Sequence, residues 1–119
     1  MKDHRKLRAF QLADQFALSA YQVTSALPNS ELFGLTGQIR RAAVSAASNI
    51  VEGCSRTSQP DYLRFLEVAH GSLREAGYQL SLAARLGYLA QQEYRSIHKE
   101  YQEASKALAA LINKIRSEL

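Results

Sequence analysis

The chain has 119 residues, of which 46% are hydrophobic and 22% are charged, and its formal net charge is +4 at pH 7. This is the length of one domain, with enough apolar residues to bury a core without help from a metal ion or a disulfide. The composition excludes an intrinsically disordered chain, and the lack of any run of about 20 apolar residues excludes a membrane-spanning segment. We therefore expect a single domain over residues 1–119.

The first predicted helix spans about residues 6–27. Its apolar residues recur at steps of four and three, which is the spacing of a helix rather than a strand. This stripe consists of Ala9, Ala13, Phe16, Ala20, Val23 and Leu27. Pro28 is expected to end the helix, because proline lacks an amide hydrogen and disfavours the helical conformation in the residue before it.

The second predicted helix covers about residues 35–54. Its apolar stripe is Leu35, Ile39, Ala42, Ala46 and Ile50. Alanine, which fills four of the central positions, favours the helix and lets a neighbouring helix approach closely. Gly53 is the expected C-terminal stop.

The third predicted helix covers about residues 59–86, between Ser58 as N-cap and Gly87 as the residue after its end. Its stripe is Tyr62, Leu66, Ala69, Leu73, Ala76, Leu80 and Ala83. Gly71 and Gly77 interrupt it, and each costs about 1 kcal/mol relative to alanine in a helix interior. We expect close approach of a neighbouring helix to compensate at both glycines.

The fourth predicted helix covers about residues 90–117. Its stripe is Tyr94, Ile97, Tyr101, Ala104, Leu108, Leu111 and Ile115. All four stripes follow a period of about 3.5 residues, which is typical of helices packed at shallow angles. Because the connections are short, consecutive helices should be antiparallel neighbours. The sequence predicts an all-α, antiparallel up-down-up-down four-helix bundle.

A file of polar residues accompanies the apolar stripe of the second helix. It consists of Gln38, Ser45, Asn49 and Glu52, with Arg41, Ser72 and Glu75 as candidate partners. The file has four interpretations: a solvated stripe, a hydrogen-bonded network inside the bundle or between subunits, a surface that binds a partner, or a catalytic site. We favour the network, because an unpaired buried polar group costs about 1–3 kcal/mol and a satisfied network therefore fixes helix register.

Three ordered stretches carry a family resemblance: "LTGQIRRAAVSAASNIVEGCSR", "SQPDYLRFLEVAHGSLREAGYQL" and "LGYL". Together they resemble the 23S rRNA intervening-sequence protein family of four-helix bundle proteins. The resemblance implies a small cytosolic bacterial bundle. A related group, the accessory variability determinant of diversity-generating retroelements, forms ring-shaped homopentamers that bind nucleic acid and a reverse transcriptase through a basic surface. By this similarity we expect a homopentamer, although Ala46 and Ala76 are smaller than the residues usual at those positions.

The basic residues are the candidate contacts with a partner. The N-terminal eight residues hold four cations against one carboxylate, so the rest of the chain carries only about +1. Candidate nucleic-acid-binding residues are Lys2, Arg5, Lys6, Arg8, Arg40, Arg41 and Arg56. In a homopentamer each of them is copied five times, and salt-dependent affinity grows with the number of phosphates neutralised.

Catalytic and metal-binding patterns are weak. The sequence has one Glu-x-x-His motif, Glu67 to His70, whereas a di-iron bundle needs two such motifs and two further glutamates. It has no glycine-rich phosphate loop and no Gly-x-Ser-x-Gly turn. Cys54, the single cysteine, is near a helix C-terminus, which disfavours the thiolate. We therefore expect no enzyme activity, no cofactor and no metal.

The functional hypothesis is a non-enzymatic, homo-oligomeric accessory protein that binds structured RNA or an RNA–protein complex. The alternative is a protein-interaction scaffold that binds no nucleic acid. The lone cysteine and the absence of an apolar stretch in the first ten residues predict a cytoplasmic protein with no membrane contact.

Overall fold

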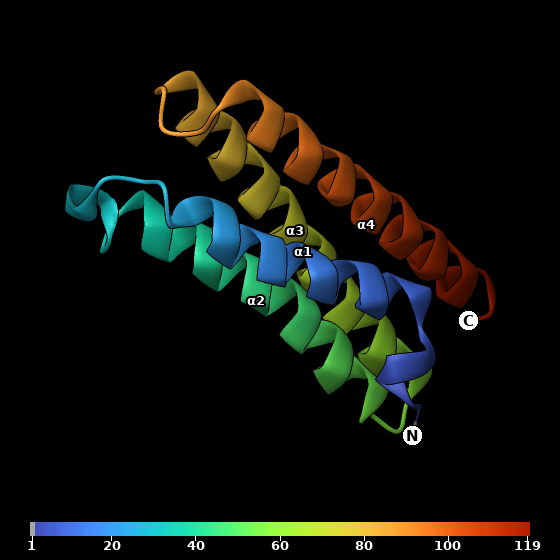
Figure 1. Cartoon of the computed structure of the whole chain (residues 1–119). Coiled ribbons are helices and arrows are strands. Elements are labelled where there is room, and N and C mark those ends of the chain that lie inside the picture. The colour runs from blue at the N-terminus through green and yellow to red at the C-terminus, as the bar shows by residue number, and fades with distance from the viewer. Residues whose placement is uncertain (1) are drawn as a thin grey trace.

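The computed structural model describes residues 2–119, which form four α-helices and two short 3-10 helices and contain no strand. The helices are α1 (Arg8–Thr24), α2 (Leu35–Cys54), α3 (Gln59–Arg85) and α4 (Gln91–Ser117), with η1 (His4–Lys6) before α1 and η2 (Asn29–Glu31) before α2. Each α-helix packs against the next one and α4 packs against α1. The predicted all-α four-helix bundle is confirmed (Figure 1).

The bundle is an elongated body of 44 × 24 × 19 Å with two different ends. Both termini and the α2–α3 turn lie at one end, and the α1–α2 and α3–α4 loops lie at the other (Figure 1). Within the described part of the chain, no helix combines the length and apolar character that a membrane crossing requires.

The ends of α3 follow the predicted capping chemistry. The Ser58 hydroxyl accepts a hydrogen bond from the Asp61 amide at 3.2 Å, and Pro60 occupies the first turn. At the other end Gly87 has a φ of 82°, a left-handed conformation that favours glycine. The Tyr88 amide then donates to the Ala83 carbonyl at 2.9 Å, which closes the helix end.

Helix α1 is shorter than predicted at both ends. Leu7 is extended, so the chain before Arg8 forms the separate turn η1, capped by the Asp3 carboxylate. At the far end the helix stops at Thr24, and Leu27 lies in a turn in which its amide donates to the Thr24 carbonyl. The residues just before Pro28 therefore leave the helix earlier than the apolar pattern indicates.

The core is formed by the predicted stripes, with two shifts of register. The largest fully buried aliphatic and phenyl side chains are Phe16, Ile39, Ile50, Leu66, Leu73, Leu80, Ile97 and Leu108. Thr24 is buried where Val23 was expected, and Ile112 is buried where Leu111 was expected. The cause is that a straight helix has 3.6 residues per turn and drifts by about 20° per heptad from a 3.5-residue stripe.

The two glycines inside α3 have different surroundings. A Cβ atom at Gly77 would lie 2.5 Å from the ring of Tyr101, so here the prediction of close helix approach is confirmed. A Cβ atom at Gly71 would meet nothing within 4 Å, so for Gly71 the prediction is wrong. Gly71 is on the exposed side of α3, where no neighbouring helix of the same chain can reach it.

Candidate nucleic-acid interface

The N-terminal segment, residues 2–8, packs against the end of α2 and the start of α3. The Lys2 amide donates to the Cys54 carbonyl at 2.9 Å, and its ammonium donates to Gln59 Oε1 at 3.2 Å. The same ammonium lies 4.4 Å from the centroid of the Tyr62 ring. These contacts hold the N-terminal cations at the end of the bundle that contains both termini (Figure 1).

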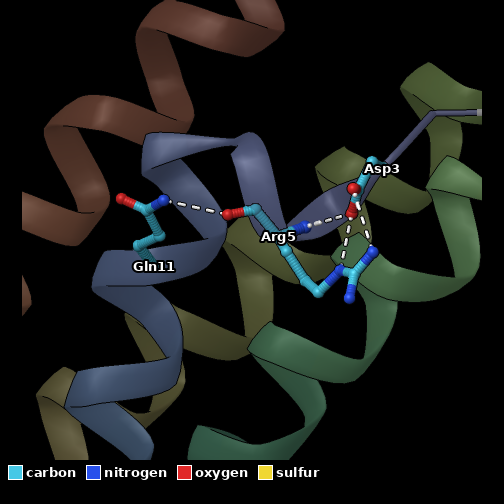
Figure 2. Close-up of polar contacts among 3 residues, drawn as sticks. All are labelled: Asp3, Arg5 and Gln11. Atoms are coloured by element: carbon cyan, nitrogen blue, oxygen red, sulfur yellow. Dashed lines mark hydrogen bonds and ion pairs between the residues drawn. The ribbon is translucent and has the colours of Figure 1, made fainter.

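Arg5 is partly neutralised by its neighbour. Its Nε and Nη2 atoms donate to the two carboxylate oxygens of Asp3 at 3.0 and 3.1 Å, and Gln11 donates to the Arg5 carbonyl at 2.9 Å (Figure 2). The hydrogen bond from the Arg5 side chain is the main cause that lowers the pKa of Asp3. The Arg5 side chain nevertheless remains 78% exposed.

The other cations at this end differ in how much of their charge is compensated. Among residues 2–119, Lys6 and Arg8 form no ion pair. Arg56 pairs with Glu52, one turn earlier in the chain, and its guanidinium lies 4.8 Å from the centroid of the Phe65 ring. The terminal end of the bundle therefore has a cationic surface, formed by Lys2, Arg5, Lys6, Arg8 and Arg56, in which two carboxylates are already paired. We call this surface the basic end.

Arg40 and Arg41 lie outside the basic end. Arg41 and Cys54, two residues before Arg56, are separated by about 20 Å along the axis of α2. Arg40 Nε donates to Thr24 Oγ1 at 2.9 Å, and its guanidinium lies 4.7 Å from the centroid of the Tyr21 ring. Arg41 is exposed and, within the described residues, forms no ion pair. The seven predicted basic residues thus divide into five at one end and two near the other.

Two members of the polar file and one candidate partner, Ser72, meet between α2 and α3. The hydroxyl oxygens of Ser45 and Ser72 lie 2.9 Å apart, and the Asn49 amide donates to the carbonyl and the hydroxyl of Ser45 at 2.8 and 3.0 Å. Glu52 instead pairs with Arg56 at the surface. The Ser45–Ser72 hydrogen bond joins the two helices at mid-length, and the Asn49 amide supports it from within α2.

Gln38 and Glu75 are exposed and line an open hollow of about 280 Å³ between α2 and α3. Gln79, which was not among the predicted residues, lines the same hollow and is only 8% exposed. Its Oε1 atom has no hydrogen-bonding partner within residues 2–119. The signal in the sequence was its spacing of four from Glu75 and seven from Ser72, which places all three on one side of the helix.

The residues considered for catalysis or metal binding either form other contacts or are buried. Glu67 pairs with Arg116, and His70 Nε2 lies 3.2 Å from Ser105 Oγ. Cys54 is 2% exposed, and burial is the main cause that raises the pKa of its thiol. No group of three or more His, Cys, Asp or Glu side chains within residues 2–119 is arranged to hold a metal ion.

Sequence reasoning missed the most exposed large apolar residue. Phe33, in the turn before α2, is 92% exposed, and Leu32 beside it is 49% exposed. An open hollow of about 530 Å³ lies nearby between α1 and α2 and is lined by Tyr21, Gly37, Arg40, Arg41, Val44 and Ser45. The available signal was an aromatic residue inside the loop "PNSELFG", where turn-forming residues are otherwise typical.

Comparison with known proteins agrees with the observed architecture. The family model described as "23S rRNA-intervening sequence protein" matches residues 5–110. A crystal structure from Bacteroides thetaiotaomicron, described as a protein of unknown function from the S23 ribosomal protein family, superposes with a TM-score of 0.80 and 28% sequence identity. The match covers 87% of this chain and 97% of that one, and no curated protein matches. The chain therefore belongs to the 23S rRNA-intervening sequence protein family.

Proposed function

We propose that this protein is a non-enzymatic, homo-oligomeric accessory protein that binds nucleic acid, with structured RNA or an RNA–protein complex as its target. The observation that carries the proposal is the basic end, where a structured N-terminal segment presents four cations against one carboxylate. Backbone phosphates are recognised by such surfaces with little reading of base sequence. The proposed cellular site is the cytoplasm.

Assembly is part of the proposal, because one copy offers few uncompensated charges. Lys6 and Arg8 have no ion pair among the described residues, whereas Arg5 and Arg56 share their charge with carboxylates. A homopentamer, which the family resemblance suggests, would repeat the basic end five times. With one or two phosphate contacts per copy it would make about 5–10 contacts, enough to lose about 10³–10⁵-fold in affinity between 50 and 200 mM salt.

A protein-interaction scaffold is the second candidate, and the exposure of Phe33 favours it. A phenyl ring that is 92% exposed is poorly solvated and gains free energy when another apolar surface covers it. The two candidates differ in how binding responds to salt, since apolar docking depends only weakly on ionic strength.

The first experiment titrates the purified chain into a labelled RNA hairpin and a labelled DNA duplex by fluorescence anisotropy at several salt concentrations. Light scattering gives the mass of the protein under the same conditions. A steep linear fall of log affinity with log salt is expected. No binding at 50 mM salt would overturn the nucleic-acid proposal and support the scaffold. Affinity for RNA that is independent of salt would overturn the proposed docking on backbone phosphates.

A further inference from the structure

Phe33 is held in place by a well-ordered loop. The Glu31 carboxylate accepts one hydrogen bond from the Leu35 amide at 3.1 Å and another from the Tyr88 hydroxyl at 3.2 Å. The Gly34 amide donates to the Glu31 carbonyl at 3.0 Å. These contacts tie the turn to the start of α2 and to the α3–α4 loop, and the phenyl ring extends from this turn into solvent.

The hollow between α1 and α2 has the chemistry to receive an aromatic ring. The Tyr21 ring and Val44, which are 47% and 41% exposed, supply apolar walls. The Arg40 guanidinium is held over Tyr21 by hydrogen bonds to Thr24 Oγ1 and to the Tyr21 carbonyl. A guanidinium and a tyrosine ring in fixed positions are groups against which a second aromatic ring packs favourably.

Gly37, which lines this hollow beside the Phe33 loop, allows two polar groups to approach the start of α2 closely. A Cβ atom there would lie 3.1 Å from the Leu32 carbonyl oxygen and 3.2 Å from Arg41 Nη1. The absence of a side chain therefore lets the Arg41 guanidinium fold back along α2. The hollow, at about 530 Å³, is in the size range of sites that bind small aromatic groups.

We propose that Phe33 of one copy of this chain occupies the α1–α2 hollow of the next copy. The charges agree with this pairing, because Glu31 is the only charged residue of the loop 25–34 and the hollow carries Arg40 and Arg41. In its own chain Phe33 is almost fully exposed, so its own hollow does not cover it. The proposal rests on the proposed homo-oligomer and names the contact that builds it.

We take the proposed contact to be heterologous, so that each copy gives its ring to one neighbour and receives a ring from the other; a reciprocal exchange of rings would instead close a two-fold dimer. Repetition of such a contact gives a closed ring when the rotation between copies closes. Both surfaces lie toward the loop end of the bundle, so neighbouring copies would stand side by side. The basic ends would then point in one common direction, as a multivalent phosphate-binding surface requires.

Two variants test the contact by light scattering over a range of protein concentrations. Phe33→Ala removes the ring, and Val44→Trp fills the hollow. Each is expected to raise the dissociation constant of the assembly by roughly 30-fold or more, as for a central interface residue. Circular dichroism should show an unchanged fold, because both positions are at the surface.

Two matched controls are available in the same chain. Val68→Ala removes another exposed apolar side chain, at the middle of α3. Ala110→Trp fills a different hollow, of about 620 Å³ between α1 and α4, which is bordered by Leu7 and Leu111. Both controls should keep the mass of the unmodified protein. Loss of assembly with Ala110→Trp but not with Val44→Trp would overturn the proposal and place the ring in the α1–α4 hollow.

Mixing the two variants tests whether one intact contact is enough to join two chains. The Val44→Trp chain keeps its Phe33, and the Phe33→Ala chain keeps an open hollow, so one productive contact remains for each pair. The mixture is expected to form a dimer of the two variants and to stop there. A mixture that stays monomeric, or a Phe33→Ala variant that keeps the unmodified mass, would overturn the proposal.

The outcomes also separate this inference from the proposed function. If the unmodified protein assembles and Phe33→Ala assembles equally well, the Phe33 contact fails and the proposed oligomer stands. If the unmodified protein is monomeric at every concentration, the contact and the proposed assembly fail together, whereas the salt titration still tests the basic end. If Val44→Trp weakens RNA binding without changing the mass, the hollow receives a nucleotide base and the contact between copies is overturned.

Discussion

The two ends of the bundle differ in the kind of side chain that they expose. At the end with both termini, residues 2–8 present four cations. Two carboxylates at this end, those of Asp3 and Glu52, are paired with Arg5 and Arg56. At the end with the two interhelical loops, Phe33 and Leu86 are 92% and 53% exposed, and the loop 25–34 carries one charge. Both ends are built on the same four helices, so the difference arises from the connecting segments.

This difference predicts two separate kinds of binding. Exposed cations are well solvated, and they gain free energy when they displace counterions from a phosphate backbone, so their binding depends on salt. An exposed phenyl ring is poorly solvated and gains free energy when another apolar surface covers it. Self-association through this ring should depend on protein concentration and only weakly on salt. Variants at the basic end should therefore leave the assembly intact, whereas variants at the loop end should weaken RNA binding only as far as they disperse the assembly.

Reversal of three charges at the basic end is the largest expected effect. The triple variant Arg5→Glu, Lys6→Glu and Arg8→Glu should lower affinity for RNA by about 100-fold or more at low salt, because it replaces phosphate contacts with repulsion. The fold should be kept, because all three side chains are exposed and none is part of the core. Anisotropy titration measures the affinity, and urea unfolding checks the fold.

A matched control carries the same change in net charge at the loop end. It combines Arg85→Glu, Arg95→Glu and Lys99→Glu, all of which are exposed. Its RNA affinity should fall much less than that of the basic-end variant. Equal losses in the two variants would show that net charge alone, rather than the basic end, controls binding.

The next largest expected effect is on the stability of the bundle, when the glycines inside α3 are replaced by alanine. Gly77→Ala places a Cβ atom 2.5 Å from the Tyr101 ring, so it should destabilise the bundle by about 1–3 kcal/mol. Gly71→Ala meets nothing within 4 Å and should stabilise α3 by about 0.5–1 kcal/mol. Thermal unfolding of the pair measures the contrast, and equal Tm values would contradict the close packing at Gly77.

A smaller effect is expected from Tyr88→Phe, which removes the hydrogen bond between the α3–α4 loop and Glu31. The Leu35 amide, which donates to the same carboxylate, should exchange its hydrogen about two- to tenfold faster because local opening becomes easier. Tyr94→Phe, which removes the contact of a hydroxyl with His98 inside α4, serves as the control. Unchanged exchange at Leu35 would contradict a tightly held Phe33 loop.

The fold could be predicted from the sequence because helix signals are local. The cap at Ser58, the stop at Gly87 and the spacing of apolar residues each depend on neighbours within two turns, and all of them agree with the structure. The failures are nonlocal. Whether Gly71 or Gly77 meets a neighbouring helix depends on the rotation of α3 about its axis, which the pattern of apolar residues does not resolve to a single residue.

The candidate site was harder to predict, because it depends on which separate segments meet. The cluster of cations at residues 2–8 could be predicted from the sequence. Its proximity to Arg56 could not, because it depends on the packing of the chain start against Cys54. Arg40 resembled the other arginines in the sequence, yet it is bound to Thr24 and Tyr21. Phe33 was missed because exposure is a property of the folded molecule, and an aromatic residue in a loop can equally well pack against the core.

The smallest expected effect is a pH dependence that arises at His70, in the middle of the bundle. Burial is the main cause that lowers the pKa of His70, and the positive charge of Arg74 adds to it. In the unfolded chain the pKa returns to about 6.5. Between these two values the unfolded state binds more protons, so the stability contributed by neutral His70 is complete above pH 6.5 and is lost as the pH falls toward the lowered value.

Urea unfolding between pH 7.5 and 5 measures this slope. His70→Gln should flatten it, and Arg74→Gln should reduce it in part, because Arg74 is the second cause of the shift. Since His70 contacts Ser105 between α3 and α4 and is far from both binding surfaces along the helices, RNA affinity and assembly mass should not follow the His70 titration. If either of them changes with pH in the unmodified protein and not in His70→Gln, the two ends are coupled through the middle of the bundle and do not act independently.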